Sequence, residues 1–396
     1  MSHPPITTDT DGTRGPLSGI VVVDLSRVLA GPYCTMFLAD LGATVIKIES
    51  PKGDDTRQWK PPAVDGKSTY FLSINRNKHS IALDLSKEED LETAYALIDR
   101  ADVLVENFKP GGLKKFGLDA SQTAKRWPDL IHASITGFGK KGGEKLPGYD
   151  LLAQALSGFM HVTGEAEGHP QRAGFALFDV FTGLHAAVGV LAALYERGIS
   201  GTGQSVEVNL LSSALSAMAN QSAAYTAGGH EPMRMGNDHP SLFPYGPFKA
   251  ADGNIVVCCG NDNQFRVFMD AIGATEVAEE DRYATMERRN ANRDPLRTTI
   301  EQQLAAHTVS EWFDTLGAAG VCCAPILTVG GGVDYATKLG LDPVWDSGQP
   351  GDYPTVANPI TLSATPALMR KPAPELDADA HAVKQWIRET NPRKDS

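Results

Sequence analysis

The sequence predicts an α/β protein built on a parallel, doubly wound sheet. Gly19–Leu25 and Ala43–Glu49 are short apolar runs that indicate buried strands, and Tyr33–Leu41 between them indicates a helix. Together these segments make one βαβ unit. The alternation of apolar strands and helices continues as far as Thr136. Strands that are apolar along their whole length are typical of a parallel sheet covered by helices on both faces.

The rest of the chain is expected to contain further strands and helices, divided by a linker between two domains. Residues 228–247 are rich in Gly, Pro and polar side chains, which predicts a linker into a second domain. The expected strands are 80–85, 102–107, 130–136 and 205–210 before this linker, and 254–259 and 321–328 after it. The expected helices are 87–101, 121–127, 150–160, 180–197, 211–227, 264–272, 295–307, 310–319 and 378–389. Three glycines at 330–332 predict a second loop.

Composition excludes several classes of protein. The net charge is −12, with no basic stripe, so we expect no nucleic-acid partner. The five cysteines show neither a disulfide framework nor zinc-ligand spacing, so we expect free thiols and no metal site. The N-terminal residues have neither the apolar core of a signal peptide nor a transit-peptide pattern. The longest apolar stretch, Leu184–Tyr195, is too short to span a bilayer. We therefore expect a cytoplasmic protein without a membrane partner.

Motifs spread over nearly the whole chain resemble, in order, those of the family III CoA-transferases, the CaiB/BaiF family. They are VVVDLSRVLAGPYCTMFLADLG (21–42), NRNKHSIALDL (75–85), DVLVENFKPG (102–111), SITGFG (134–139), PGYDLLAQALSGFMHVTG (147–164), GFALFDVFTGLHAAVGVLAAL (174–194), GTGQSVEVNLLSS (201–213) and KPAPELDADAHAV (371–383). Further stretches are similar to the branch that passes CoA between dicarboxylates such as succinate and glutarate. They are GDDTRQWKPP (53–62), STYFLSINRNK (68–78), NLLSSALSAMANQSAAY (209–225) and GNDNQF (260–265).

This resemblance implies an architecture and a set of ligands. It implies a Rossmann-like large domain made from both chain ends, a smaller α+β domain between them, and an interlocked homodimer. The expected boundaries are a loose tail (1–15), the first part of the large domain (16–227), a linker (228–247), the small domain (248–329), a second linker (330–349) and the return segment (350–396). Acyl-CoA and a free carboxylic acid are implied as substrates, with no tightly bound cofactor.

Asp179 is the nucleophile that the resemblance implies. A carboxylate can attack a thioester to give a mixed anhydride, which the CoA thiolate then opens to an aspartyl thioester. Asp179 also precedes a long predicted helix, whose first amides are expected to hold the carboxylate ionised. The alternative for this residue is a plain helix N-cap.

Gly148-Tyr149-Asp150 separates two reaction types. The same fold hosts α-methylacyl-CoA racemases, which have a histidine where this chain has Tyr149. A tyrosine, with an ordinary pKa of about 10, cannot replace that imidazole as a base near neutral pH. Asp150 has either a functional role or a capping role. Racemase activity and a catalytically silent CoA-binding protein remain the alternatives to CoA transfer.

The remaining candidate residues bind CoA, cover the site or hold the acceptor. By resemblance, Arg27, Val28, Asn107, Phe108 and Lys115 are at CoA-contact positions, and Lys52 stands near a position where the family often has an arginine. For Lys52 and Lys115 the alternative is an ordinary surface lysine. Gly260, Asn261, Asp262, Asn263 and Gln264 replace the family's glycine-rich active-site loop, either as a lid or as a strand-to-helix turn with Asn263 as N-cap. Arg57, Arg76 and His239 are candidates for the far carboxylate of a dicarboxylate.

Overall fold

The structure, a computed structural model, describes residue 6, residues 14–349 and residues 351–389 of the chain. The tail predicted over 1–15 lies mostly outside the described residues, as do 350 and 390–396 of the predicted return segment. The chain divides into two compact units. The large unit comprises residues 1–159, 173–229 and 341–396, and the small unit comprises residues 160–172 and 230–340.

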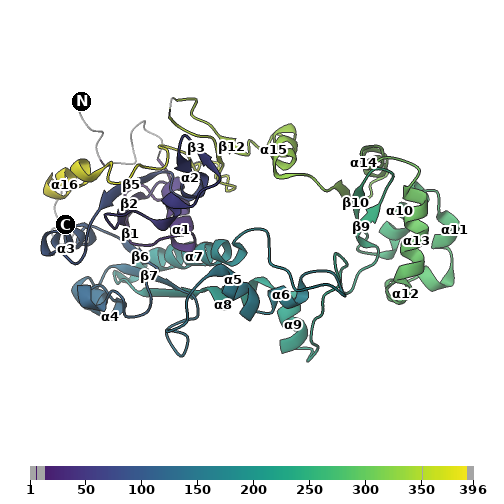
Figure 1. Ribbon diagram of the computed structural model, residues 1–396, viewed down its shortest axis with the longest axis horizontal. Helices are drawn as coiled ribbons and strands as arrows, with labels where there is room; N and C mark the ends of the chain where they lie inside the picture. The colour runs from purple at the N-terminus through teal and green to yellow at the C-terminus, as the bar shows by residue number, and fades with distance from the viewer. Residues whose placement is uncertain (1–5, 7–13, 350, 390–396) are drawn as a thin grey trace. The chain divides into compact units, whose positions relative to one another are not determined.

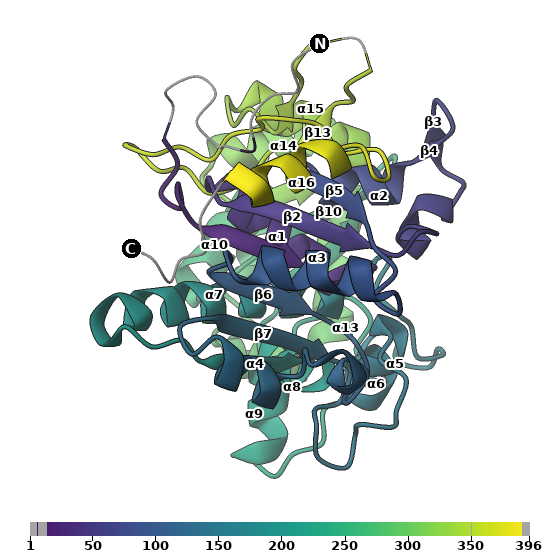
Figure 2. The ribbon, with the colours of Figure 1, turned by 90° about the vertical axis from the view of Figure 1, so that its left-hand side faces the viewer.

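A six-stranded parallel sheet forms the centre of the large unit (Figures 1 and 2). Its strands are β1 (Val21–Asp24), β2 (Thr44–Glu49), β5 (Lys78–Ala82), β6 (Val103–Glu106), β7 (Ile131–Thr136) and β8 (Ser205–Asn209), in the order β5-β2-β1-β6-β7-β8. All neighbours pair in parallel. The chain builds outward from β1 to β5 and then continues on the other side with β6, which is the Rossmann strand order. The prediction of a doubly wound parallel sheet is confirmed.

Helices cover both faces of this sheet, as the uniformly apolar strands predict. On one face, α3 (Glu88–Ile98), α4 (Ala120–Arg126) and α16 (Ala380–Glu389) lie together (Figure 2). The buried side chains of Leu97 and Val383 share one apolar core with Ile46 of the sheet. On the other face, α1 (Ala30–Asp40) and α7 (Leu177–Ser200) pack on alternate residues of the same strands. The near C-terminal helix α16 thus packs beside β5 and α3, far from both in sequence.

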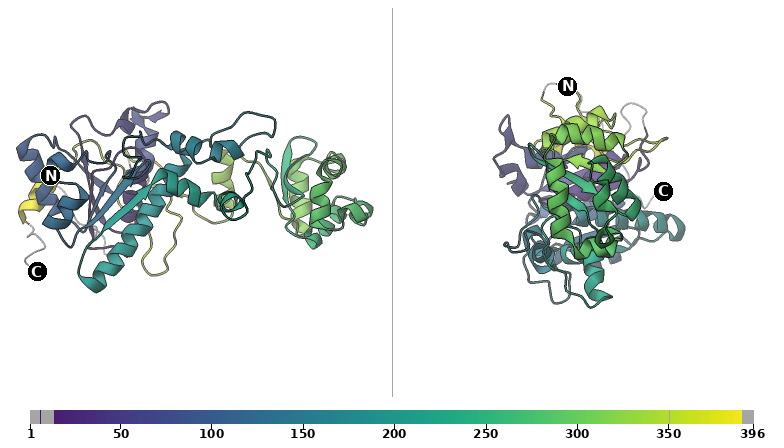
Figure 3. Two further views of the ribbon diagram at one scale, coloured as in Figure 1. Left: turned by 90° about the horizontal axis from the view of Figure 1, so that it is seen from below. Right: turned by 90° about the vertical axis from the view of Figure 1, so that its right-hand side faces the viewer.

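The long helix α7 runs beside the sheet of the large unit (Figure 3). By length and composition it is apolar enough to cross a membrane. One side of it, including Ala186 and Val190, is buried against α1 and the sheet, as in a core helix.

The remaining elements of the large unit are short. They are α2 (Thr69–Ile74), α5 (Asp150–Leu156), α8 (Leu210–Ala217), α9 (Asn220–Thr226), η1 (Asp55–Gln58), η2 (Lys114–Phe116) and the ribbons β3 (Ala63–Val64) with β4 (Lys67–Ser68) and β12 (Val344–Trp345) with β13 (Thr355–Val356). The prediction of one helix over 211–227 is wrong. Ala219 has a φ of 38°, which interrupts the helical path and separates α8 from α9.

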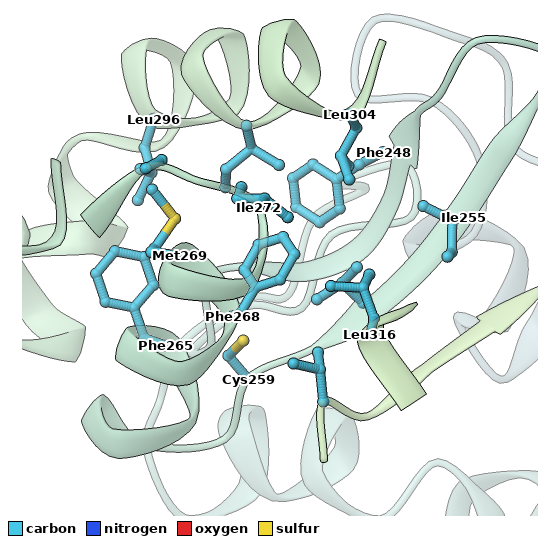
Figure 4. Close-up of a cluster of buried hydrophobic side chains, with 14 of the residues drawn as sticks. Phe248, Ile255, Cys259, Phe265, Phe268, Met269, Ile272, Leu296, Leu304 and Leu316 are labelled. Carbon is cyan, nitrogen blue, oxygen red and sulfur yellow. The ribbon is translucent and has the colours of Figure 1, made fainter. Parts of the chain in front are cut away.

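The small unit contains a three-stranded antiparallel sheet and a set of helices, of which α13 and α14 contact the sheet. The strands are β9 (Tyr245–Lys249), β10 (Asn254–Cys258) and β11 (Cys323–Pro325), in the order β11-β10-β9. The helices are α6 (Phe159–Val162, which begins at the last residue of the large unit), α10 (Asp262–Ala271), α11 (Thr275–Ala278), η3 (Asp281–Tyr283), α12 (Met286–Ala291), α13 (Arg293–Leu304), α14 (Val309–Ala318) and α15 (Val329–Lys338). Figure 4 shows the apolar core, in which Phe265, Phe268 and Met269 of α10 meet Leu296 and Leu304 of α13.

Helix α15 occupies a segment for which the sequence predicts a loop, and that prediction is wrong. The side chain of Thr328 caps the helix by accepting a hydrogen bond from the Gly331 amide at 3.1 Å. Capping satisfies one of the amides that a helix start leaves without a partner. This local contact supports a helix start in spite of three consecutive glycines.

Candidate active site

The strand order of the large sheet reverses between β1 and β6, and these two strands are neighbours. In open α/β sheets, ligands bind outside the carboxyl ends of the strands at such a switch point. The turn after β1 carries Arg27 and Val28, and β6 is followed directly by Asn107. The Arg27 amide donates to Asn107 Oδ1 at 2.9 Å, and Asn107 Nδ2 donates to the Arg27 carbonyl oxygen at 2.6 Å. The fold therefore brings together three of the predicted CoA-binding residues.

Asp179 lies in the first turn of α7, the helix that packs on α1. The N-cap of this helix is Ala176, so Asp179 is not the cap that the alternative interpretation required. Its side chain is half-buried, and its carboxylate has no hydrogen-bond partner among the residues that the structure describes. A carboxylate in this state is available to a ligand.

Asp150, in the first turn of α5, takes the capping role at α7. One of its carboxylate oxygens accepts hydrogen bonds from the amides of Phe178 (2.7 Å) and Asp179 (3.1 Å). Gln154 donates to the other oxygen and accepts from the Ala173 amide at 2.8 Å, which ties the preceding loop to the same group. Asp150 is thus buried and occupied by the chain itself. Asp150 therefore has a structural role at the start of α7 and not as the cap of α5, the helix that begins at its own position, and a functional role for it stays a prediction.

The protonation state of Asp179 differs from the expectation. Burial, and then the negative charge of Asp150, raises the pKa of Asp179 from 3.8 to about 7. The expectation that the helix amides hold it ionised is wrong, because the amides of residues 178 and 179 bond to Asp150 instead. At neutral pH both the protonated and the ionised form of the carboxyl group are therefore populated. A group in this state can exchange protons, and its ionised form can act as a nucleophile.

Tyr70, on α2, interacts electrostatically with Asp179 and was not among the candidate residues of the sequence analysis. Burial, and then the charges of Asp179, Asp150 and Asp54, raise the pKa of its phenol well above the ordinary value. The phenol therefore stays protonated and can act as a hydrogen-bond donor near Asp179. Asp54 in turn accepts a hydrogen bond from the Val28 amide at 3.3 Å. Tyr70 thus interacts with Asp179 and with Asp54, the carboxylate that holds the turn at the switch point. The only sequence signal was its place in the conspicuous STYF segment.

The other predicted CoA contacts are more dispersed. Phe108 packs at the edge of the sheet core and lines a cavity of about 40 Å³ together with Lys109 and Lys140. Lys115 is exposed in η2, with its ammonium group 4.6 Å from the ring centre of Phe116. Lys52 is exposed and lines a separate cavity of about 240 Å³. For Lys52 and Lys115, the role in CoA binding stays a prediction.

Two of the cations predicted for the far carboxylate already have partners in the protein. Arg57 makes two hydrogen bonds to Glu49, at 2.8 and 2.7 Å, and lies over the ring of Phe71. Arg76 is buried and makes two hydrogen bonds to Asp40, at 3.0 and 2.7 Å. Both guanidinium groups thus support the fold, and their role toward a substrate stays a prediction.

The remaining candidates belong to the small unit. His239 accepts a hydrogen bond from the Ser241 amide at its Nδ1, at 3.1 Å. The segment 260–264 is a strand-to-helix turn in which Asn261, rather than Asn263, is the N-cap of α10, accepting from the Gln264 amide at 2.9 Å. Gln264 also accepts from the Gly260 amide at 2.7 Å, and Arg289 pairs with Asp262 at 2.6 Å. A lid function for this turn stays a prediction.

Comparisons with known proteins point to one family. Residues 17–380 match the family model described as CoA-transferase family III. A succinate–glutarate CoA-transferase of Agrobacterium fabrum is 39% identical over 381 residues, which cover 93% of this chain and 95% of the relative. An acetyl-CoA:oxalate CoA-transferase of Acetobacter aceti is 37% identical, over 94% of this chain and 96% of the relative.

Solved structures give the same result. The crystal structure of a CaiB/BaiF family protein from Brucella suis superposes with a TM-score of 0.86 at 38% identity, covering 94% of this chain and all of that one. Both the family match and the identities extend over nearly the whole chain. The chain therefore belongs to CoA-transferase family III and is a CoA-transferase.

Proposed function

We propose that this enzyme transfers CoA from succinyl-CoA to a dicarboxylate such as glutarate, through a covalent aspartyl-CoA thioester on Asp179. The observation that carries the proposal is a half-buried carboxyl group that has no hydrogen-bond partner in the described chain and whose pKa is about 7. It lies in the first turn of α7, in a chain similar over most of its length to a succinate–glutarate CoA-transferase.

The proposed steps balance as exchanges between carboxyl groups. An Asp179 oxygen attacks the thioester carbonyl, the C–S bond breaks, and CoA leaves as thiolate, which gives a mixed anhydride. The thiolate attacks the aspartyl carbonyl, the donor acid leaves as carboxylate, and an aspartyl thioester remains. The acceptor carboxylate then attacks the aspartyl thioester, and CoA leaves again as thiolate, which gives a second mixed anhydride. The thiolate attacks the acceptor's carbonyl in this anhydride, which releases the new acyl-CoA and the free Asp179 carboxylate. The covalent route thus divides one difficult transfer into several easier steps.

The residues around Asp179 support these steps. Burial raises the pKa of the carboxyl group, which makes the ionised form a stronger nucleophile than an exposed carboxylate. The protonated phenol of Tyr70 is a donor for the negative charge that develops on the thioester oxygen. Because Asp150 fixes the start of α7, the position of Asp179 is set by the chain and not by the ligand.

The substrate assignment rests on the relatives. The two relatives named above are a transferase of succinate and glutarate and one of oxalate, so both accept a dicarboxylate. A dicarboxylate needs a cation for its far carboxylate. His239, Arg57 and Arg76 remain the candidates, and the two arginines would have to share or exchange their present partners.

A substrate panel tests the proposal. Purified enzyme is mixed with succinyl-CoA or acetyl-CoA and a series of mono- and dicarboxylates, and the acyl-CoA products are identified by mass spectrometry. We expect transfer from succinyl-CoA to glutarate, none with Asp179→Asn, and normal transfer with Asp314→Asn, an exposed aspartate of α14. Transfer to monocarboxylates alone would remove the dicarboxylate assignment.

Racemisation and silent CoA binding are the alternative outcomes. A racemase needs a second acid–base group, but Tyr149 is 62% exposed at the start of α5. We expect no washout of α-deuterium from a 2-methylacyl-CoA into the solvent. Washout at a rate comparable to transfer would favour the racemase, and CoA binding without either reaction would favour the silent protein.

We also propose that the enzyme is a cytoplasmic homodimer. An apolar stripe on α7, made by Val188, Leu191, Tyr195 and Ile199, is 36–76% exposed in the single chain. An apolar surface of this kind is typical of an oligomer interface. The five cysteines are free, which suits a reducing compartment. Light scattering at low protein concentration should give the mass of a dimer, and an active monomer would contradict this.

A further inference from the structure

The turn after β1 has an unusual backbone at the switch point of the sheet. Val28 has a φ of 70°, in the left-handed region that β-branched residues rarely adopt. Such conformations persist only where the surroundings fix them, and they gather at functional sites. The turn carries Arg27, whose side chain is 54% exposed and pairs with Asp55 at 3.3 Å.

The turn consists of Ser26, Arg27 and Val28, and the backbone of each residue is hydrogen-bonded to side chains from other positions. The Ser26 amide donates to Asp24 at 2.9 Å, and its carbonyl oxygen accepts from Lys47 Nζ at 2.8 Å. Both polar groups of the Arg27 backbone bond to the side-chain amide of Asn107. The Val28 amide donates to Asp54 at 3.3 Å. The conformation is therefore fixed from outside the turn.

Two of these holding groups are themselves fixed by charge. Lys47 and Asp54 form a fully buried ion pair at 3.1 Å. The Asp54 amide donates to Glu49 at 2.9 Å, and Thr56 donates to the Asp54 carboxylate from its amide (3.0 Å) and its hydroxyl (2.8 Å). A buried ion pair with further hydrogen bonds has few alternative arrangements. Asp54 and Lys47 are thus rigid supports on either side of Arg27.

Asn107 is the one support that directly follows β6, across the switch point. Its amide oxygen accepts from the Arg27 amide and its amide nitrogen donates to the Arg27 carbonyl oxygen, so both ends of the side-chain amide are engaged by the turn. We propose that Asn107 is a positioning residue, which holds the Arg27–Val28 turn and thereby fixes where the Arg27 guanidinium lies at the switch point, the place where acyl-CoA is expected to bind. This inference rests on the proposed function, and it gives Asn107 a role through Arg27 where the resemblance implies a direct CoA contact.

A double-mutant cycle on Asn107 and Arg27 tests the proposal. We expect Asn107→Ala to lower kcat for CoA transfer about tenfold or more, with KM for acyl-CoA changed by less than about threefold. In an Arg27→Ala background the same change should lower kcat by less than about twofold, because Asn107 acts through Arg27. A raised KM at unchanged kcat, or effects that multiply in the double variant, would show a direct CoA contact and overturn the proposal.

A second measurement does not depend on any substrate. Hydrogen exchange read by mass spectrometry reports the protection of the Arg27 and Val28 amides in the full-length protein. Asn107→Ala should speed exchange in this peptide by about tenfold or more, while peptides of β2 and β7 stay protected. Unchanged exchange would overturn the proposal. If wild-type enzyme fails to transfer CoA, the proposed function fails, and the exchange result still decides the role of Asn107.

Discussion

Replacing Asp179 by Asn should stabilise the protein at high pH while it abolishes transfer. The pKa of Asp179 is raised from 3.8 to about 7 by burial and by Asp150. A carboxyl group raised in the folded state binds more protons there than in the unfolded state between about pH 4 and pH 7. The free energy of unfolding of the wild type therefore falls as pH rises through this window. Asn has nearly the same shape and carries no charge, so the variant should not show this fall in the free energy of unfolding.

The size of the effect follows from the shift. The change from 3.8 to about 7 is roughly three pKa units, each worth 1.36 kcal/mol, so the full effect is on the order of 4 kcal/mol. Above about pH 7 the variant should gain most of this free energy of unfolding, and at pH 4.5, less than one unit above the ordinary pKa of 3.8, it should gain only about 1 kcal/mol. At the usual unfolding entropy per residue, the gain corresponds to a rise in Tm of roughly 5 °C for a chain of this length.

Thermal unfolding of wild type and Asp179→Asn, measured at half-unit steps from pH 4.5 to pH 8.5, checks this prediction. The difference in Tm between the two proteins should grow with pH and level off above about pH 7. Asp314→Asn, an exposed change on α14, should show no such trend. A difference that is flat or shrinks with pH would refute the argument that burial raises the pKa of Asp179.

Three further substitutions have defined outcomes. Tyr70→Phe should lower kcat about ten- to a hundredfold at similar KM and Tm, because a hydrogen bond to a charged group is worth about 1.5–3 kcal/mol; an unchanged kcat would remove Tyr70 from the site. Asp150→Asn keeps an acceptor for the α7 amides but removes the charge, so the pKa seen in the pH profile of kcat/KM should fall below about 7; an unchanged midpoint would contradict this. Arg289→Ala leaves Asp262 and two backbone carbonyls without their donor, and should destabilise the small unit by about 2–3 kcal/mol in chemical denaturation. Arg288 is the exposed neighbour of Arg289, and Arg288→Ala should lower the free energy of unfolding by less than about 1 kcal/mol.

The fold of the large unit was largely predictable from the sequence. The six strands of the main sheet were expected within three residues of their observed ends, because most of them, such as β1, β2 and β6, are largely apolar runs between polar segments. The errors are local. Helix α15 was missed because glycines weigh against a helix, whereas the cap at Thr328 supports one. The break at Ala219 was missed because a single residue of unusual φ leaves no mark in a helical pattern.

The residues of the candidate site could be nominated from the sequence, but their electrostatics could not. The aspartate and the residues of the turn were identified from the motifs that surround them. The protonation of Asp179 depends on which group accepts the first amides of α7, and that group, Asp150, is 29 residues away. In the same way, the electrostatic interaction of Tyr70 with Asp179 and the two hydrogen bonds between Arg27 and Asn107 are set by tertiary contacts. Sequence pattern does not contain such distances.

The central claim is a covalent bond between Asp179 and the transferred group, and trapping tests it most directly. Enzyme is incubated with succinyl-CoA without acceptor, treated with hydroxylamine, digested and analysed by peptide mass spectrometry. The account predicts a hydroxamate on Asp179, formed only when acyl-CoA is present and absent from Asp179→Asn. Full transfer activity in an enzyme whose Asp179 peptide stays unmodified, or a hydroxamate on another carboxyl group, would contradict it.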